Sequence, residues 1–314
     1  MRAGTGLFAT FVAAALSGCM GSTVPPSGAL QDRAAQLPSP PVVASRESQR
    51  MKYYYGRVQQ SLVAQGLLRT DGGGRDTPYT AAQLAETFKR IALYEEYTNL
   101  GGHIVAKATA SKLHRWAEPI RMSLTFGGAI PPEQEAKDRQ AVMSYASRLS
   151  RVTDHPVRMV GAGGNPNFHV FIVDEDARRE LGPELRRIIP TIDKAAVNTV
   201  VNLPRSSYCL VIGYDPEDDG TYRTAVAVIR AEHPDLLRLS CIHEELAQGM
   251  GLSNDSPLAR PSVFNDDEEF ALLTRMDEEL LAMLYDPRLK PGMDAEEAEP
   301  IVRQIAAERM GGET

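Results

Sequence analysis

The spacing of apolar residues along the chain predicts an α+β protein. Apolar positions recur every three to four residues from 46 to 65 and from 80 to 94, which is typical of amphipathic helices. The second stretch begins with Thr80-Ala-Ala-Gln83, a capping-box sequence that marks a helix N-terminus. Later apolar runs alternate with polar residues or are continuous, and they predict strands between longer amphipathic helices. The predicted strands are 120–126, 157–160, 167–174, 208–214 and 224–230, the predicted helices are 131–152, 236–250 and 295–314, and the charged segment 175–187 is predicted as a helix or a loop.

These elements divide the chain into three parts beyond residue 45. An N-terminal helical segment spans 46–114, a main domain with a mixed β-sheet spans 115–294, and a C-terminal helix or tail spans 295–314. Because the strand at 167–174 is apolar at nearly every position, we expect it in the middle of the sheet.

The first residues carry the pattern of a secreted and anchored protein. Arg2 precedes an apolar run, 7–16, which suits a secretory signal and is too short for a permanent membrane helix. The next residues, Leu16-Ser-Gly-Cys19, resemble the bacterial lipobox, whose cysteine becomes the lipidated first residue. This resemblance implies a signal peptide over 1–18 and a location in the bacterial cell envelope, on the periplasmic or outer-surface side. An ordinary signal peptide followed by a chance cysteine is the alternative.

Composition and charge indicate which partners the protein can bind. Residues 19–45 are rich in Pro, Ser, Ala and Gly, which predicts a semi-extended tether between the lipid and the folded part. The formal net charge is -7 and no basic stripe offsets it, which argues against a nucleic-acid partner. The expected partners are the membrane, through lipidated Cys19, and an envelope protein or peptide.

The cysteine count predicts one disulfide. The chain has three cysteines, and a lipidated Cys19 would leave Cys209 and Cys241. An even remainder in an oxidising compartment favours a bond between them. Two buried free thiols are the alternative, because free cysteine is often buried.

The stretch from Ser240 to Asp255 has the spacing of a zinc-protease helix without the histidine ligands. No His-Glu-x-x-His sequence is present. His243 is interpreted as a structural histidine, and a base or metal ligand from outside the pattern is the alternative. Moving the register by one residue places Glu244, Glu245 and Gln248 where two ligands and a general base would share one helix face.

This stretch resembles the active-site motif of the metzincins with its ligands exchanged. The resemblance implies that Glu244 and Gln248 occupy the first two ligand positions and that Glu245 occupies the general-base position. Gly251 would be the glycine that ends the helix. Asn254, or its neighbour Asp255, would occupy the third ligand position.

Such an oxygen-rich set suits a hard divalent metal ion better than zinc. The alternative is that these side chains form hydrogen bonds with one another in place of a lost metal site. The metal-site hypothesis predicts a bound divalent cation, and the hydrogen-bond hypothesis predicts no cofactor.

A metzincin also has a methionine turn beneath its metal. Met283 and Tyr285 resemble this turn, and Met293 is another candidate for its methionine. An apolar helix face is the alternative for Met283, because neighbouring apolar residues have helical spacing. These neighbours are Phe270, Leu273, Met276, Leu280 and Leu284.

Three segments resemble domain of unknown function 2927, a family of bacterial lipoproteins and secreted proteins. They begin at Glu244, Phe264 and Leu284, and the resemblance runs from about Thr80 to Met293. It implies no reaction. We therefore expect a lipid-anchored envelope protein with a degenerate metzincin-like domain that serves as a non-catalytic binding or scaffold module. The alternatives are a divergent metal-dependent peptidase with Glu245 as base and a calcium-stabilised structural protein.

Overall fold

The computed structural model describes residues 43–311, except 101, 102, 162 and 266, and it leaves the side chains of 96–108 undescribed. The predicted signal peptide, Cys19 and nearly all of the tether lie outside these residues. Contacts group residues 42–314 into one compact unit. In the described part of the chain, no helix is long and apolar enough to cross a membrane.

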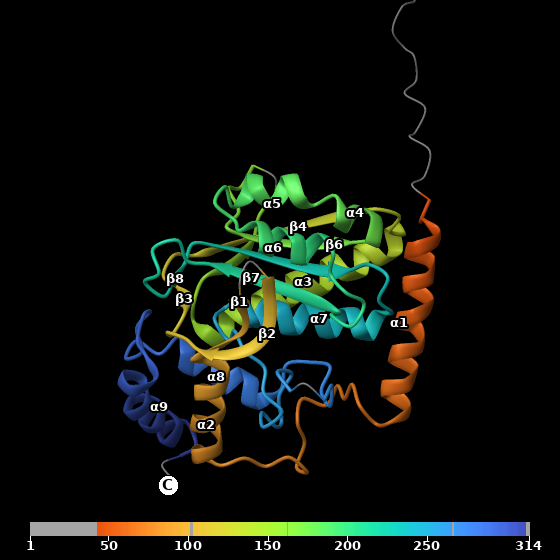
Figure 1. Ribbon diagram of the computed structural model, residues 1–314. Coiled ribbons are helices and arrows are strands. Elements are labelled where there is room, and N and C mark those ends of the chain that lie inside the picture. Colours follow the sequence, from red (N-terminus) through yellow and green to blue (C-terminus); the bar gives the residue numbers. More distant parts are fainter. Residues whose placement is uncertain (1–42, 101–102, 162, 266, 312–314) are drawn as a thin grey trace, which may run out of the picture. The chain divides into compact units, whose positions relative to one another are not determined.

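A five-stranded mixed sheet forms the centre of this unit (Figure 1). Its strands lie in the order β5 (Val157–Met159), β4 (Ile120–Gly127), β6 (Phe168–Val173), β9 (Thr224–Arg230) and β7 (Cys209–Tyr214). The first four are parallel, and β7 is antiparallel to β9 at one edge. The predicted α+β class and the central position of β6 are confirmed.

Helices cover both faces of the sheet. One face packs against α3 (Pro132–Thr153) and α7 (Asp235–Gln248), which share the larger apolar core with alternate residues of β4 and β9. The other face packs against α5 (Gly182–Ile188) and α6 (Lys194–Val201), which follow the short helix α4 (Glu175–Arg179). The motif helix α7 is therefore an interior element, covered by the sheet on one side.

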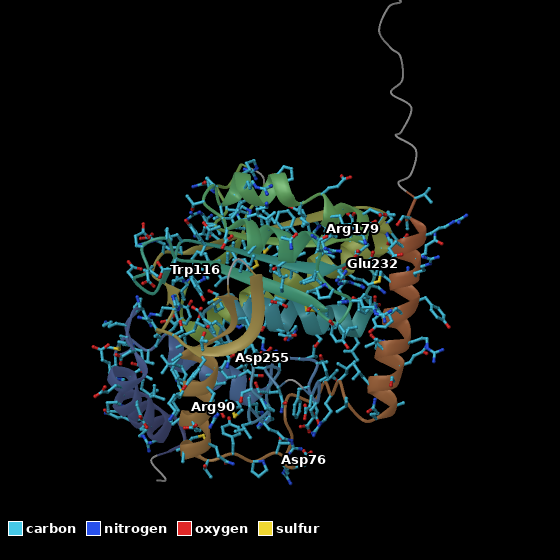
Figure 2. The ribbon with its side chains drawn as sticks, in the orientation of Figure 1. Asp76, Arg90, Trp116, Arg179, Glu232 and Asp255 are labelled. Atoms are coloured by element: carbon cyan, nitrogen blue, oxygen red, sulfur yellow. A yellow bond between two sulfur atoms is a disulfide. The ribbon has the colours of Figure 1, made fainter. Side chains whose placement is uncertain are left out.

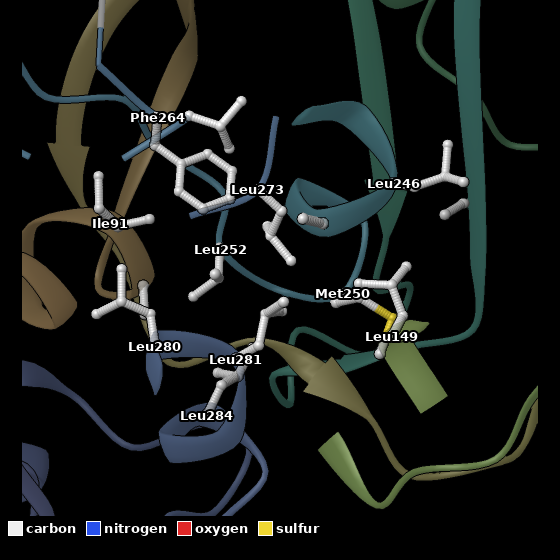
Figure 3. Close-up of a cluster of buried hydrophobic side chains, with 14 of the residues drawn as sticks. Ile91, Leu149, Leu246, Met250, Leu252, Phe264, Leu273, Leu280, Leu281 and Leu284 are labelled. Atoms are coloured by element: carbon white, nitrogen blue, oxygen red, sulfur yellow. The ribbon is translucent and has the colours of Figure 1, made fainter. Parts of the chain in front are cut away.

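Further helices cover the other side of α7. They are α2 (Ala81–Ala92) and α8 (Arg275–Leu284), and α9 (Ala295–Arg309) packs against both of these. Figure 3 shows apolar side chains of α2 and α8 near those of the motif helix and of the chain after it. The labelled residues of this cluster are Ile91, Leu149, Leu246, Met250, Leu252, Phe264, Leu273, Leu280, Leu281 and Leu284. The capping box predicted at Thr80 is present, with Gln83 as its partner.

The N-terminal segment differs in part from the helical prediction. Helix α1 (Arg46–Ala64) and helix α2 are present, but α2 ends at Ala92 and an antiparallel hairpin follows. Its strands are β1 (Tyr94–Leu100) and β2 (His103–Ala110). The sequence pattern did not indicate where α2 ends, because Tyr94 continues the apolar spacing of the helix although it is the first residue of β1. A further small parallel pair joins β3 (Arg115–Trp116) to β8 (Thr221–Tyr222).

Buried contacts set the position of α7 beneath the sheet. The ring of His243 stacks on that of Tyr145 from α3, with centroids 4.1 Å apart, and its Nδ1 accepts a hydrogen bond from the Leu273 amide at 3.0 Å. Arg238, also on α7, forms a buried ion pair with Asp138 of α3 at 2.7 Å. His243 therefore belongs to the core, and burial lowers its pKa to about 3.

This burial predicts a loss of stability in mild acid. His243 stays neutral in the folded protein, whereas in the unfolded chain it gains a proton below its ordinary pKa of 6.5. Between pH 6.5 and about pH 3, the unfolded state therefore binds more protons than the folded state. The free energy of unfolding decreases as the pH is lowered across this range. In urea unfolding, the free energy of unfolding of the native chain should decrease between about pH 6 and pH 5 by roughly 1 kcal/mol more than that of His243→Gln. An equal pH dependence of the two proteins would contradict a neutral buried His243.

The predicted disulfide is present. It joins Cys209, the first residue of β7, to Cys241 on α7, across 32 positions of sequence. The bond therefore ties the edge strand of the sheet directly to the motif helix.

Reduction of this bond should destabilise the protein by roughly 2–4 kcal/mol, because the unfolded chain regains the freedom that a loop of this length removes. Denaturant unfolding with and without reductant measures the change. The double variant Cys209→Ala, Cys241→Ala is the control, because reductant should not alter its midpoint. An unchanged midpoint for the native chain would contradict the prediction.

Candidate functional site

Motif residues line a cavity between α7 and the edge strand β7. The cavity has a volume of about 260 Å³, and we call it the α7 pocket. Glu244, Glu245 and Gln248 line it from α7, and Asp255 lines it from the following loop. The remaining lining residues are Ser206, Tyr208, Cys209, Leu210, Val211, Gly213, Tyr222, Ser253, Val263, Asn265 and Glu268.

Hydrogen bonds separate the predicted ligand positions into two groups. The Gln248 amide donates to Asp255 Oδ1 at 2.9 Å, so these two side chains interact within the α7 pocket. Asn254 is absent from the pocket lining, and its amide donates to the Arg90 carbonyl near the end of α2. Figure 2 labels Arg90 and also Asp255, the neighbour of Asn254 in the sequence. The structure thus brings Glu244, Glu245, Gln248 and Asp255 together, but it leaves Asn254 on the opposite side of its loop.

The chain reversal after α7 depends on two glycines. Gly251 has a φ of 125°, and a Cβ atom there would lie 2.0 Å from the His114 carbonyl oxygen. A Cβ atom on Gly249 would lie 2.4 Å from the ring of Phe168. Only glycine lets the backbone pass this close to β6 and to the residue before β3. Gly251 therefore lets the chain turn, whereas helix α7 itself ends at Gln248 with Gly249 as its C-cap.

Aromatic side chains hold the carbonyl groups at the end of α7. Trp116 Nε1 donates to the Gly249 oxygen at 2.8 Å, and the Tyr285 hydroxyl donates to the Met250 oxygen at 3.0 Å. Carbonyls at a helix C-terminus lack partners within the helix, so these donors satisfy groups that would otherwise be buried without one. Burial raises the pKa of Tyr285, which keeps its hydroxyl proton available for this bond.

Met283 lies in the last turn of α8 and is fully buried. Its position is that of the apolar helix face, the alternative that the sequence left open. Tyr285 follows this helix directly and contacts the end of α7, as described above. The pair therefore lies beneath the motif helix, with Tyr285 making the polar contact.

The α7 pocket is strongly acidic. Four carboxylates line it, from Glu244, Glu245, Asp255 and Glu268. Among the described residues of its lining, none is Lys, Arg or His. Such a concentration of one charge sign in a concave site attracts cationic groups. Carboxylate oxygens also suit hard cations, although the described residues include no group of three His, Cys, Asp or Glu side chains arranged to hold a metal ion.

A second, larger cavity continues from the α7 pocket along β7. Its volume is about 1110 Å³, and we call it the β7 cleft. The two cavities share lining residues Leu210, Val211, Gly213, Tyr222 and Ser253. Glu95 and Ala110, at the base of the β1–β2 hairpin, line the cleft opposite β7, and Figure 1 shows the hairpin in front of this strand.

Sequence reasoning did not identify Glu268, Asp215 or His114 as site residues. Asp215 belongs to an acid-rich segment, 215–219, that directly follows β7, and Glu268 belongs to a second one, 266–269. These two segments were the available signals in the sequence. His114 has no acidic neighbours in the sequence and reaches the site through the tertiary fold.

Comparison with known proteins identifies the family. The family model described as "Protein of unknown function (DUF2927)" matches residues 81–304, from the start of α2 into α9, and so includes both cavities. No curated protein and no solved structure matches the chain. Because the match covers well over half of the sequence, the resemblance seen in its three segments is confirmed. The chain belongs to the DUF2927 family.

Proposed function

We propose that this protein is a lipid-anchored protein of the bacterial cell envelope that binds an extended segment of a partner protein or peptide along β7. The observation that carries the proposal is an edge strand bordered by two adjoining acidic cavities. The lipid anchor rests on the sequence from Leu16 to Cys19.

The position of β7 supports recognition of an extended chain. Within the part of the chain that the structure describes, β7 pairs only with β9, so its outer edge faces the cavities instead of another strand. An unpaired sheet edge presents backbone donors and acceptors that a partner strand can satisfy. Gly213 lets the Tyr222 ring pack directly against β7, because a Cβ atom at this position would lie 2.5 Å from that ring.

The lining chemistry supports a basic partner and a binding role. The four carboxylates of the α7 pocket complement Lys or Arg side chains. The two neutral ligand positions of the metzincin-like motif are engaged, Gln248 with Asp255 and Asn254 with the Arg90 carbonyl. These bonds support the hypothesis that hydrogen-bonded polar residues replace a metal site in a degenerate metzincin-like domain.

A rigid frame supports this role as well. The disulfide fixes β7 to α7, so both walls of the α7 pocket keep their spacing before a partner arrives. A preformed groove binds more tightly because less conformational freedom is lost on binding.

Binding can be tested with capped nonapeptides in which Lys alternates with Val, added to the full-length protein in detergent micelles. Fluorescence anisotropy should detect binding that weakens about tenfold or more in Glu244→Gln, since a charge-assisted contact is lost. Glu299→Gln, on the distant helix α9, is the control variant and should bind as the native chain does.

The same assay can show whether the peptide backbone pairs with β7. A strand uses every second N–H toward its neighbour, so N-methylation of one alternate set of residues should abolish binding while methylation of the other set should not. Equal effects of the two methylated peptides, or no binding of any peptide, would contradict the proposal.

A divergent metal-dependent peptidase is the second candidate function. The observation that favours it is the presence of Glu244, Glu245 and Asp255 in one pocket, with Glu245 as general base. The residues fit a metal only in part. Asn254 lies outside the pocket, and the Gln248 side chain is an amide, which is a weak ligand for zinc.

Elemental analysis of the purified full-length protein separates the two functions. A binding module should carry only substoichiometric metal, and its unfolding midpoint should not respond to a chelator. Stoichiometric metal in the native chain that is lost in Glu244→Ala, with Glu299→Ala as control, would favour the peptidase over the binding module.

A further inference from the structure

The β7 cleft contains a buried carboxylate that the fold does not fully satisfy. Asp215 follows the last residue of β7, lines the cleft, and its side chain is 6% exposed. Its Oδ2 accepts a hydrogen bond from the Gly220 amide at 2.7 Å. Its Oδ1 is buried and has no hydrogen-bond partner among the described residues. An unsatisfied buried acceptor costs about 1–3 kcal/mol, so a donor supplied by a ligand would be favourable here.

His114 forms the wall beside this carboxylate. Its Nε2 lies 3.5 Å from Asp215 Oδ2, which is longer than an ordinary hydrogen bond. Its Nδ1 lies 3.0 Å from the Lys112 carbonyl, which can only accept, so Nδ1 carries a proton. The ring stacks on Tyr222, with centroids 5.2 Å apart and planes 15° apart. His114 is thereby held in place, and it does not reach Oδ1 of Asp215.

The surrounding charges favour a cation. Five carboxylates line the β7 cleft, from Glu95, Asp215, Asp218, Asp294 and Glu296. Lys112 and His114 are the cationic or titratable bases in the same described lining. Lys112 Nζ lies 2.9 Å from Asp218 Oδ2 and 2.6 Å from the Asp218 carbonyl, so its charge is paired with that exposed carboxylate.

We propose that Asp215 forms a subsite for a Lys or Arg side chain of the segment that β7 binds, and this inference rests on the function proposed above. The cationic group would donate to Asp215 Oδ1, and Tyr222 would separate this subsite from the α7 pocket, since it lines both cavities. The subsite therefore makes the cleft selective for sequence as well as for an extended backbone.

One extended segment can pass both acidic sites. Leu210, Val211 and Gly213 of β7 line both cavities, and Asp215 follows this strand directly. The preferred ligand therefore carries two basic residues separated along one strand.

The test is a double-mutant cycle on the full-length protein in detergent micelles, using capped nonapeptides with one fixed Lys and a second position that is Lys, Arg or norleucine. Asp215→Asn should weaken binding of the Lys and Arg peptides about tenfold or more and leave the norleucine peptide unchanged. Asp218→Asn, a charge-matched change in the same cleft, should alter none of them strongly. The Lys and Arg peptides show which cation the subsite prefers.

Two outcomes of this cycle would overturn the inference. One is an equal loss for all peptides in Asp215→Asn, which would mean that Asp215 only supports the fold. The other is unchanged binding of the Lys and Arg peptides.

If no peptide binds, the proposed function is contradicted. The subsite is then tested separately by adding N-acetyl-argininamide or N-acetyl-lysinamide and recording the nuclear magnetic resonance spectrum of His114. Either compound should shift the ring resonances of His114 in the native chain and not in Asp215→Asn. No shift in the native chain would overturn the subsite independently of the peptide result.

Discussion

The attachment of α7 to the elements packed around it is the constraint on which the site depends. Three aromatic side chains donate to carbonyls of this helix and of the two residues after it: Tyr145 to His243, Trp116 to Gly249 and Tyr285 to Met250. These rings bury large apolar surfaces and use their polar tips to satisfy backbone oxygens. The helix can therefore end inside the protein without leaving its last carbonyls unpaired.

The same attachment explains why the pocket is acidic and still stable. One side of α7 meets the sheet and another meets α2 and α8, so apolar burial supports the helix without help from its carboxylates. Glu244, Glu245 and Asp255 line the pocket beside β7. The disulfide at Cys209 and Cys241 closes this arrangement from the sheet side.

The polar residues around the end of α7 turn toward different partners. Gly251 lets the chain turn here because its backbone passes against His114. Gln248 bonds to Asp255, and Asn254 bonds to the Arg90 carbonyl near the end of α2. In the part of the chain that the structure describes, β7 pairs only with β9 and borders the α7 pocket.

Local patterns in the sequence determined the elements that depend on near neighbours. The strands at 120–126 and 224–230, the capping box at Thr80 and the disulfide between Cys209 and Cys241 follow from periodicity, short-range hydrogen bonding and cysteine count. Only the tertiary structure decided which way Asn254 turns, that Met283 lies within a helix, and that Asp215 shares a cleft with His114. These features arise from contacts between residues far apart in the sequence, and a side chain's own neighbours carry no record of such contacts.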